Sequence, residues 1–74
     1  RLIQVSAHVG WVGRRVRDLQ KAASAPIPFI LRFGQGMVPD EQTIVQDGDL
    51  IYVGCANTDV DSIETILGNP PAKN

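Results

Sequence analysis

The sequence predicts an α+β fold, in which a small, mainly antiparallel four-stranded sheet has two helices on one face. Apolar and polar residues alternate over 2–9, which is the period of a half-buried strand. Two later segments repeat apolar residues every three or four positions, as amphipathic helices do. Between them, over 39–54, a Pro-Asp corner, an Asp-Gly turn and an apolar run follow one another. We therefore expect the order strand, helix, two-strand hairpin, strand, helix.

The first strand is expected over 2–9, with the apolar odd-numbered residues from Ile3 to Val9 on one face. His8 lies on the other, more polar face. A solvent-exposed or interface position is favoured for this side chain, because no cysteine and no second histidine joins it to make a metal site.

The first helix is expected to begin near Arg14 and to end before about residue 25, where Pro26 follows. It has a basic side opposite its apolar side. The apolar side carries Val16, Leu19 and Ala23, and the basic side carries Arg14, Arg17 and Lys21.

Residues 27–33 are expected to form an edge strand, because Pro26 and Pro28 offer no backbone N–H to a central ladder. The Gly34-Gln35-Gly36 stretch then supplies a hairpin turn that returns the chain through residues 37–38. It lacks the third glycine and the strand-to-helix context of a dinucleotide-binding loop.

The Asp47-Gly48 pair predicts a tight turn, because Gly48 can take a positive φ without steric cost. Residues 50–53 follow as a buried strand. Asp47 and Asp49 are expected to cap backbone N–H groups, since the spaced oxygen ligands of a calcium loop are missing.

The second helix is expected to follow Thr58, which stands three residues before Asp61 as in a capping box, and to end at Gly68. Residues 1–68 would then form one domain. The remaining residues, 69–74, are expected to be a flexible tail, because they have nothing to bury and contain two prolines.

Charge is distributed unevenly along the 74 residues, although the net charge is only −1. Residues 1–32 hold six Arg or Lys and one Asp, whereas 33–74 hold one Lys and seven Asp or Glu. This balance argues against a nucleic-acid partner.

No apolar stretch is long enough to span a membrane. The single cysteine, Cys55, suggests a reducing compartment and a buried, inert thiol.

An enzyme is not predicted, because the sequence has one histidine, one cysteine and no paired carboxylates that face a second catalytic group. An anion-binding site is the more informative hypothesis. Arg14 and Arg15 are placed in the first turn of a helix, whose free N–H groups favour an anion, and Arg32 could join them across a dimer interface. The alternative is that these arginines form an ordinary solvated surface.

Four motifs in this order resemble the TrkA C-terminal domain, also called the RCK C-terminal domain, over residues 2–67. They are the helix start Gly13-Arg14-Arg15-Val16-Arg17-Asp18-Leu19, the strand end Arg32-Phe33-Gly34, the corner at Pro39, and Gly48-Asp49-Leu50-Ile51-Tyr52-Val53-Gly54. The resemblance implies the α+β fold already expected from periodicity.

The resemblance also implies a function, that of a regulatory, ligand-sensing and dimerising domain that gates a bacterial potassium transport system without catalysis. It implies a homodimer, a membrane potassium channel or transporter subunit as partner of the full-length protein, and an N-terminal Rossmann domain in cis. The location implied is the cytoplasm, at the inner face of the plasma membrane. No cofactor is expected in this segment, because the Rossmann domain is where nucleotide would bind.

Some members of the family bind cyclic di-AMP between paired C-terminal domains. The corresponding positions here are Gln20, Lys21, Ala22 and Ile27, which lack the acidic, guanidinium and amide groups that would read this ligand. Two alternatives therefore remain open, a nucleotide or other anionic effector of unknown identity, or no effector at all.

A fold this small cannot bury all of its apolar residues in its own core. Those that we expect to remain are candidates for the dimer interface, namely Leu2, Trp11 and Ile30. For Trp11, a core position at the helix entry is the favoured alternative. The alternative to this interpretation is a β-grasp-like protein-interaction module, because such folds also end with a Gly-Asp pair followed by an apolar strand.

Overall fold

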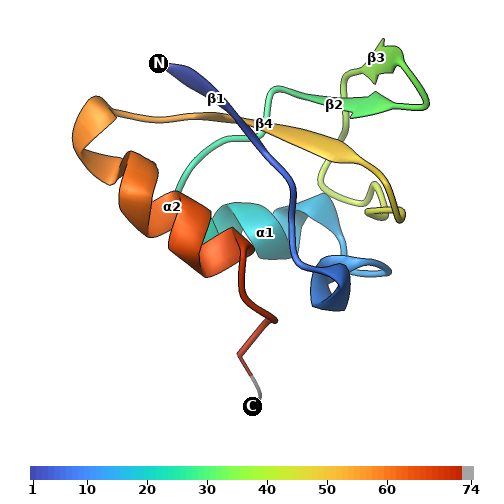
Figure 1. Ribbon diagram of the computed structural model, residues 1–74. Helices are drawn as coiled ribbons and strands as arrows, with labels where there is room; N and C mark the ends of the chain where they lie inside the picture. Colours follow the sequence, from blue (N-terminus) through green and yellow to red (C-terminus); the bar gives the residue numbers. More distant parts are fainter. Residues whose placement is uncertain (73–74) are drawn as a thin grey trace.

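The computed structural model describes residues 1–72, which fold as a sheet with both α-helices on one face (Figure 1). The sheet order is β1-β4-β2-β3, and every neighbouring pair is antiparallel. The predicted fold class is therefore confirmed. In chain order the elements are β1 (Leu2–Val5), α1 (Val16–Ala23), β2 (Phe29–Arg32), β3 (Gln35–Met37), β4 (Leu50–Gly54) and α2 (Val60–Leu67), with 3-10 turns at Val9–Trp11 and Asn57–Asp59.

The hydrophobic core lies between the sheet and the two helices. The strands β1 and β4 contribute alternate residues to it, β2 contributes Ile30, and each helix contributes one apolar side, as the two periodicities predict. The strand residues in this core are Ile3, Val5, Ile30, Ile51 and Val53, and the helix residues are Val16, Leu19, Ala23, Ile63 and Leu67.

The first strand is shorter than predicted, because β1 ends at Val5 rather than at residue 9. The backbone N–H of His8 donates to the carbonyl of Leu67 at 2.8 Å, and its Nδ1 accepts from the N–H of Gly10 at 2.9 Å. These bonds turn the chain away from β4 and into the 3-10 turn. Val9, predicted to share the buried face, is exposed in consequence.

The first helix begins later than predicted. Arg15 is its N-cap and Arg14 precedes it, so the two arginines do not lie in its first turn. Instead, Arg15 pairs with Ile44 in an isolated antiparallel bridge, which keeps this part of the chain extended. The helix ends at Ser24, which takes a left-handed conformation with φ of 53°.

The second strand, β2, is central and not the predicted edge strand. It lies between β4 and β3, because Pro26 and Pro28 both precede its first residue and leave its N–H groups free for pairing. The Pro26 carbonyl accepts the N–H of Gly54 at 3.0 Å, a bond that needs no donor from proline. The residue facing the core is Ile30, opposite Ile51 and Met37.

The hairpin turn is one step earlier than predicted. Arg32 pairs with Gln35, so Phe33 and Gly34 are the two turn residues, and both have a positive φ, of 51° and 77°. Positive φ at both turn residues is typical of the two-residue hairpin turn whose twist matches the twist of the two strands that it connects. The second turn is as predicted, because Gly48 has a φ of 87°.

The second helix has no capping box. A 3-10 turn, Asn57–Asp59, leads directly into α2, and no side chain caps its N-terminus. The hydroxyl of Ser62 donates to the Asp59 carbonyl at 2.9 Å, and Gly68 follows the last helical residue as predicted.

Part of the segment expected to be a tail contacts the domain. The indole Nε1 of Trp11 donates to the Asn69 carbonyl at 2.8 Å, and the Asn69 side chain donates to the Thr65 carbonyl. Pro71 lies so close to Gly10 that a Cβ there would sit 2.9 Å from it. Residues 73–74 of the predicted tail lie outside the described residues, and the domain boundary at 68 stays a prediction.

Replacing Ile51 with valine should lower the free energy of unfolding by about 1 kcal/mol, because one buried methylene is removed at the centre of the sheet. Urea denaturation followed by circular dichroism measures this difference. Ile66→Val is the matched control, since Ile66 is partly exposed on α2 and should change stability by less than about 0.5 kcal/mol. Equal losses in both variants would contradict the assigned core.

Candidate functional site

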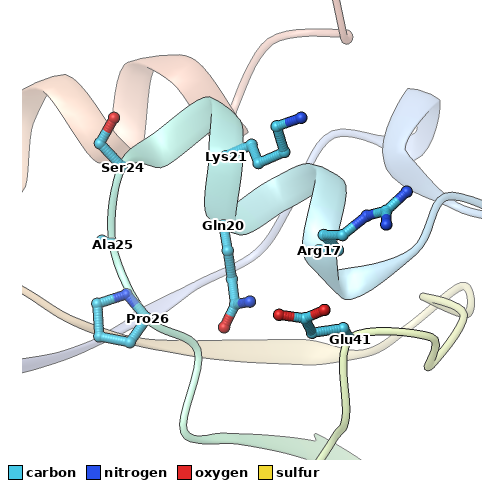
Figure 2. A pocket seen from close by; sticks show the side chains of 7 residues that line it. All are labelled: Arg17, Gln20, Lys21, Ser24, Ala25, Pro26 and Glu41. Carbon is cyan, nitrogen blue, oxygen red and sulfur yellow. The ribbon is translucent and has the colours of Figure 1, made fainter.

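A solvent-open hollow of about 400 Å³ lies beside the C-terminal half of α1 (Figure 2). The helix supplies one wall, the segment that leads to β2 supplies a second, and the loop after β3 supplies the third. Its lining residues are Arg17, Gln20, Lys21, Ser24, Ala25, Pro26 and Glu41.

Backbone geometry holds this hollow in shape. The left-handed Ser24 ends the helix and turns the chain across its end. The side-chain oxygen of Gln20 then accepts the N–H of Ile27 at 3.0 Å, and its carbonyl accepts that of Ala25 at 3.2 Å. A polar residue at position 20 therefore fixes the segment that leads to β2.

The hollow carries two cationic side chains, Arg17 and Lys21, and one carboxylate, Glu41. The N–H of Arg17 donates to the Glu41 carbonyl at 3.2 Å, which positions the loop against the helix start. All three residues are exposed, so their charges are available to a ligand. This arrangement suits a small ligand with anionic groups and a hydrogen-bonding edge.

None of the three arginines predicted to bind an anion lines this hollow. Arg14 lies over the ring of Trp11, with its guanidinium carbon 5.9 Å from the ring centroid. The Arg14 carbonyl accepts the N–H of Val45, and Arg15 pairs with Ile44. The structure brings all three near Ile44, since Arg32 Nη2 donates to the Ile44 carbonyl at 3.0 Å. Their role in ligand binding stays a prediction.

Arg32 makes an ion pair with Asp49 through two hydrogen bonds. Its Nε and Nη2 donate to the two carboxylate oxygens at 2.9 and 2.8 Å. The Asp49 side chain is 1% exposed and that of Arg32 is 21% exposed. Asp49 also accepts the N–H of Gln46 at 2.9 Å, which confirms its expected role as a backbone cap.

Burial alone would raise the pKa of Asp49. The hydrogen bond from Arg32, the N–H of Gln46 and the positive charge of Arg32 outweigh burial, so the pKa of Asp49 is lower than its usual value. The same hydrogen bond raises the pKa of Arg32. The pair therefore stays ionised in the folded protein at neutral pH and fixes the start of β4 to the end of β2.

The residues predicted for the dimer interface differ in exposure. Ile30 is 0% exposed and Trp11 is 3% exposed, so both belong to the core of a single copy, whereas Leu2 is 50% exposed. Trp11 thus takes the alternative position in the core at the helix entry. Which residues form a dimer interface stays a prediction.

Within residues 1–72, no three His, Cys, Asp or Glu side chains lie together in a way that could hold a metal ion. Among the helices of that same stretch, none has the length and apolar character to cross a bilayer. Cys55 is partly buried and packs against the core.

Comparison of the sequence with known proteins finds one informative relative. The chain is 30% identical over 70 residues to the Trk system potassium uptake protein TrkA of Streptomyces coelicolor, across 95% of this chain. It spans only 31% of the length of that relative. No family model matches the chain.

Comparison of the structure finds RCK domains. A structure described as an RCK domain with cda aligns with a TM-score of 0.74 and 21% identity, over 89% of this chain and 96% of the other. The RCK_C domain dimer of BusR from S. agalactiae, in complex with c-di-AMP, aligns with a TM-score of 0.71 and 20% identity, over 90% and 86%. BusR in complex with its busAB promoter DNA gives the same score and identity, over 90% of this chain and 34% of that one.

Both comparisons agree with the resemblance inferred from the sequence motifs. The solved structures establish the fold, and the sequence relative links that fold to a potassium uptake protein. The predicted absence of a nucleic-acid partner stays a prediction, because one neighbour in fold is a DNA complex.

Acid should weaken the protein through Asp49. Because the pKa of this group is lowered by folding, its stabilising contribution is complete above the unfolded-state pKa of about 3.9 and is lost as the pH falls through the lower folded-state pKa. We expect the free energy of unfolding of the wild type to fall more steeply below about pH 5 than that of Asp49→Asn. Urea titrations at a series of pH values measure both slopes.

Asp47→Asn is the matched control, because Asp47 is an exposed neighbour in the same turn. It should keep the wild-type slope. At neutral pH, Asp49→Asn should be less stable than the wild type by about 2 kcal/mol, since the charge of Arg32 loses its partner. Identical acid slopes for wild type and Asp49→Asn would rule out this role for the pair.

Proposed function

Since this chain is an RCK C-terminal domain, we propose that it is a non-catalytic regulatory domain that senses a small anionic effector and pairs with a second copy. The observation that carries the proposal is the hollow beside α1, where Arg17 and Lys21 stand on one helix wall. Solved structures of the same fold include an RCK_C dimer in complex with c-di-AMP, which supports both parts of the proposal.

The proposed effector is a ligand with one or more phosphate groups, because Arg17 and Lys21 are one helical turn apart and can both reach the same anionic group. Gln20 and Glu41 could form hydrogen bonds with polar groups on the rest of the ligand. We include cyclic dinucleotides and mononucleotides as candidates. The chain itself is proposed to need no other cofactor.

The proposed consequence of binding is a change in how two copies sit against each other. A ligand that prefers one pairing geometry shifts the population toward it, by as much as its affinities for the two geometries differ. In the full-length protein this shift would move attached domains and gate a potassium channel or transporter subunit. The sequence relationship to a potassium uptake protein supports this role, together with a location at the cytoplasmic side of the membrane.

Charge reversal in the hollow should weaken effector binding. We expect Arg17→Glu and Lys21→Glu each to reduce affinity for the tightest-binding nucleotide by about tenfold or more, because each removes a charge-assisted contact. Isothermal titration calorimetry against a panel of mononucleotides and cyclic dinucleotides measures the change. Circular dichroism checks that both exposed substitutions leave the fold intact.

Arg14→Glu and Arg15→Glu are the matched controls, because they reverse exposed charges that do not line the hollow. Binding that is lost in these variants but kept in the first two would move the site to the arginines predicted from the sequence. A wild-type protein that binds none of the panel would overturn the sensing proposal. In the full-length protein, loss of binding should also remove the response of potassium uptake to the effector.

A further inference from the structure

The segment that follows α2 folds back onto the 3-10 turn that follows β1. The indole Nε1 of Trp11 donates to the Asn69 carbonyl at 2.8 Å. A Cβ on Gly10 would lie 2.9 Å from the Pro71 ring, so the glycine allows the two segments to approach this closely. We call residues 69–71 the strap, because they contact the turn through both a hydrogen bond and a packed proline.

The imidazole of His8 shapes the turn that the strap contacts. Its Nδ1 accepts the N–H of Gly10 at 2.9 Å, and the same nitrogen would lie 3.2 Å from a Cβ on that glycine. The imidazole and the strap therefore both contact Gly10. The backbone N–H of His8 also donates to the carbonyl of Leu67, the last residue of α2, at 2.8 Å. This bond fixes the turn close to the point where the strap begins.

The bond from Gly10 to His8 exists only in one protonation state. A ring nitrogen that accepts a hydrogen bond carries no proton, so the observed arrangement requires a neutral imidazole. Histidine is the side chain that ordinarily changes charge between about pH 5 and 8. Protonation of Nδ1 would turn an acceptor into a donor that faces another donor, the N–H of Gly10.

We propose that His8 is a pH-sensitive switch, which keeps the strap in place while it is neutral and releases the strap when it is protonated. The turn then loses the bond that shapes it, and the strap loses its packing against Gly10. The closed arrangement requires the neutral ring, so it dominates at higher pH and is depleted as the pH falls. The switch does not use the hollow beside α1 and does not rest on the proposed function.

Charged groups near His8 favour its protonated form. Asp47 and Asp49, from the turn before β4, line the same hollow of about 170 Å³ as His8. Asp49 is paired with Arg32, whereas Asp47 is exposed and forms no ion pair among the described residues. A protonated imidazole that leaves Gly10 therefore has a carboxylate across this hollow to attract it.

The other elements around the turn add little positive charge. The strap is uncharged, and the charged residues of α2 are both carboxylates, Asp61 and Glu64. Arg14 is the basic group at the turn, with its guanidinium carbon 5.9 Å from the Trp11 ring centroid. Because Arg14 is exposed, solvent and salt screen its repulsion of a second cation.

The test is acrylamide quenching of Trp11 fluorescence from about pH 8 to pH 5. Trp11 is the only tryptophan of the 74-residue chain, so the signal reports on the residue that the strap contacts. A short terminal segment opens at little cost, and one lost hydrogen bond shifts the closed-to-open ratio by about threefold to tenfold. We therefore expect the quenching constant of the wild type to rise by about twofold or more as the pH falls.

His8→Asn is the matched variant, because an amide oxygen can accept the N–H of Gly10 without titrating. It should keep the low quenching constant over the whole pH range. Gly10→Ala opens the strap without any titration, since its Cβ would lie 2.9 Å from Pro71, and its quenching constant should already be high at neutral pH. Circular dichroism checks that each variant is folded at every pH.

Three outcomes overturn the proposal. The first is a wild-type quenching constant that does not change over the pH range. The second is a pH response in His8→Asn equal to that of the wild type, which would assign the titration to another group. The third is wild-type quenching in Gly10→Ala at neutral pH, which would show that the strap does not shield Trp11.

Discussion

A chain of 74 residues can cover only one face of a four-stranded sheet, and most of this structure follows from that limit. Both helices are used on one side, where alternate strand residues and one side of each helix form a single core. No segment of the described chain is left for the other side. The result is a two-layer molecule, with both α-helices on one side of the sheet.

The long segment between β3 and β4 has no regular structure, and side-chain and backbone hydrogen bonds hold it in place. Arg32 reaches from the end of β2 to Asp49 and to the carbonyl of Ile44, while Asp49 also binds the N–H of Gln46. At the other end of the segment, Glu41 and Thr43 accept N–H groups from the start of α1. The hollow depends on this arrangement, because Glu41 is one of its walls. An ion pair at the end of a strand thus supports a candidate ligand site formed by a helix and a loop.

The position of the candidate site on the helix side of the sheet bears on how a small regulatory domain can work. The ligand would contact exposed charges beside α1. In a paired arrangement, a signal passes to the rest of the protein if the ligand prefers one arrangement of the two copies, which requires only a difference of affinity between arrangements. The sequence relative of this chain is longer, since the chain spans 31% of its length.

The sequence by itself determined the local features of this protein. Alternation identified Ile3 and Val5 as core residues, helical spacing identified Val16, Leu19 and Ala23, and Gly48 marked its turn, because each of these patterns depends on residues a few positions apart. Its motif order also led to the correct domain family. Only the tertiary structure decided that β2 is central, that Ile30 rather than Phe29 faces the core, and that Arg32 holds Asp49. The hollow likewise joins Glu41 to Arg17 and Lys21 across a long loop. All of these are contacts between segments that lie far apart in the sequence. The chain adopts the packing that buries the most apolar surface while every buried polar group keeps a hydrogen bond, and no local sequence pattern specifies that packing.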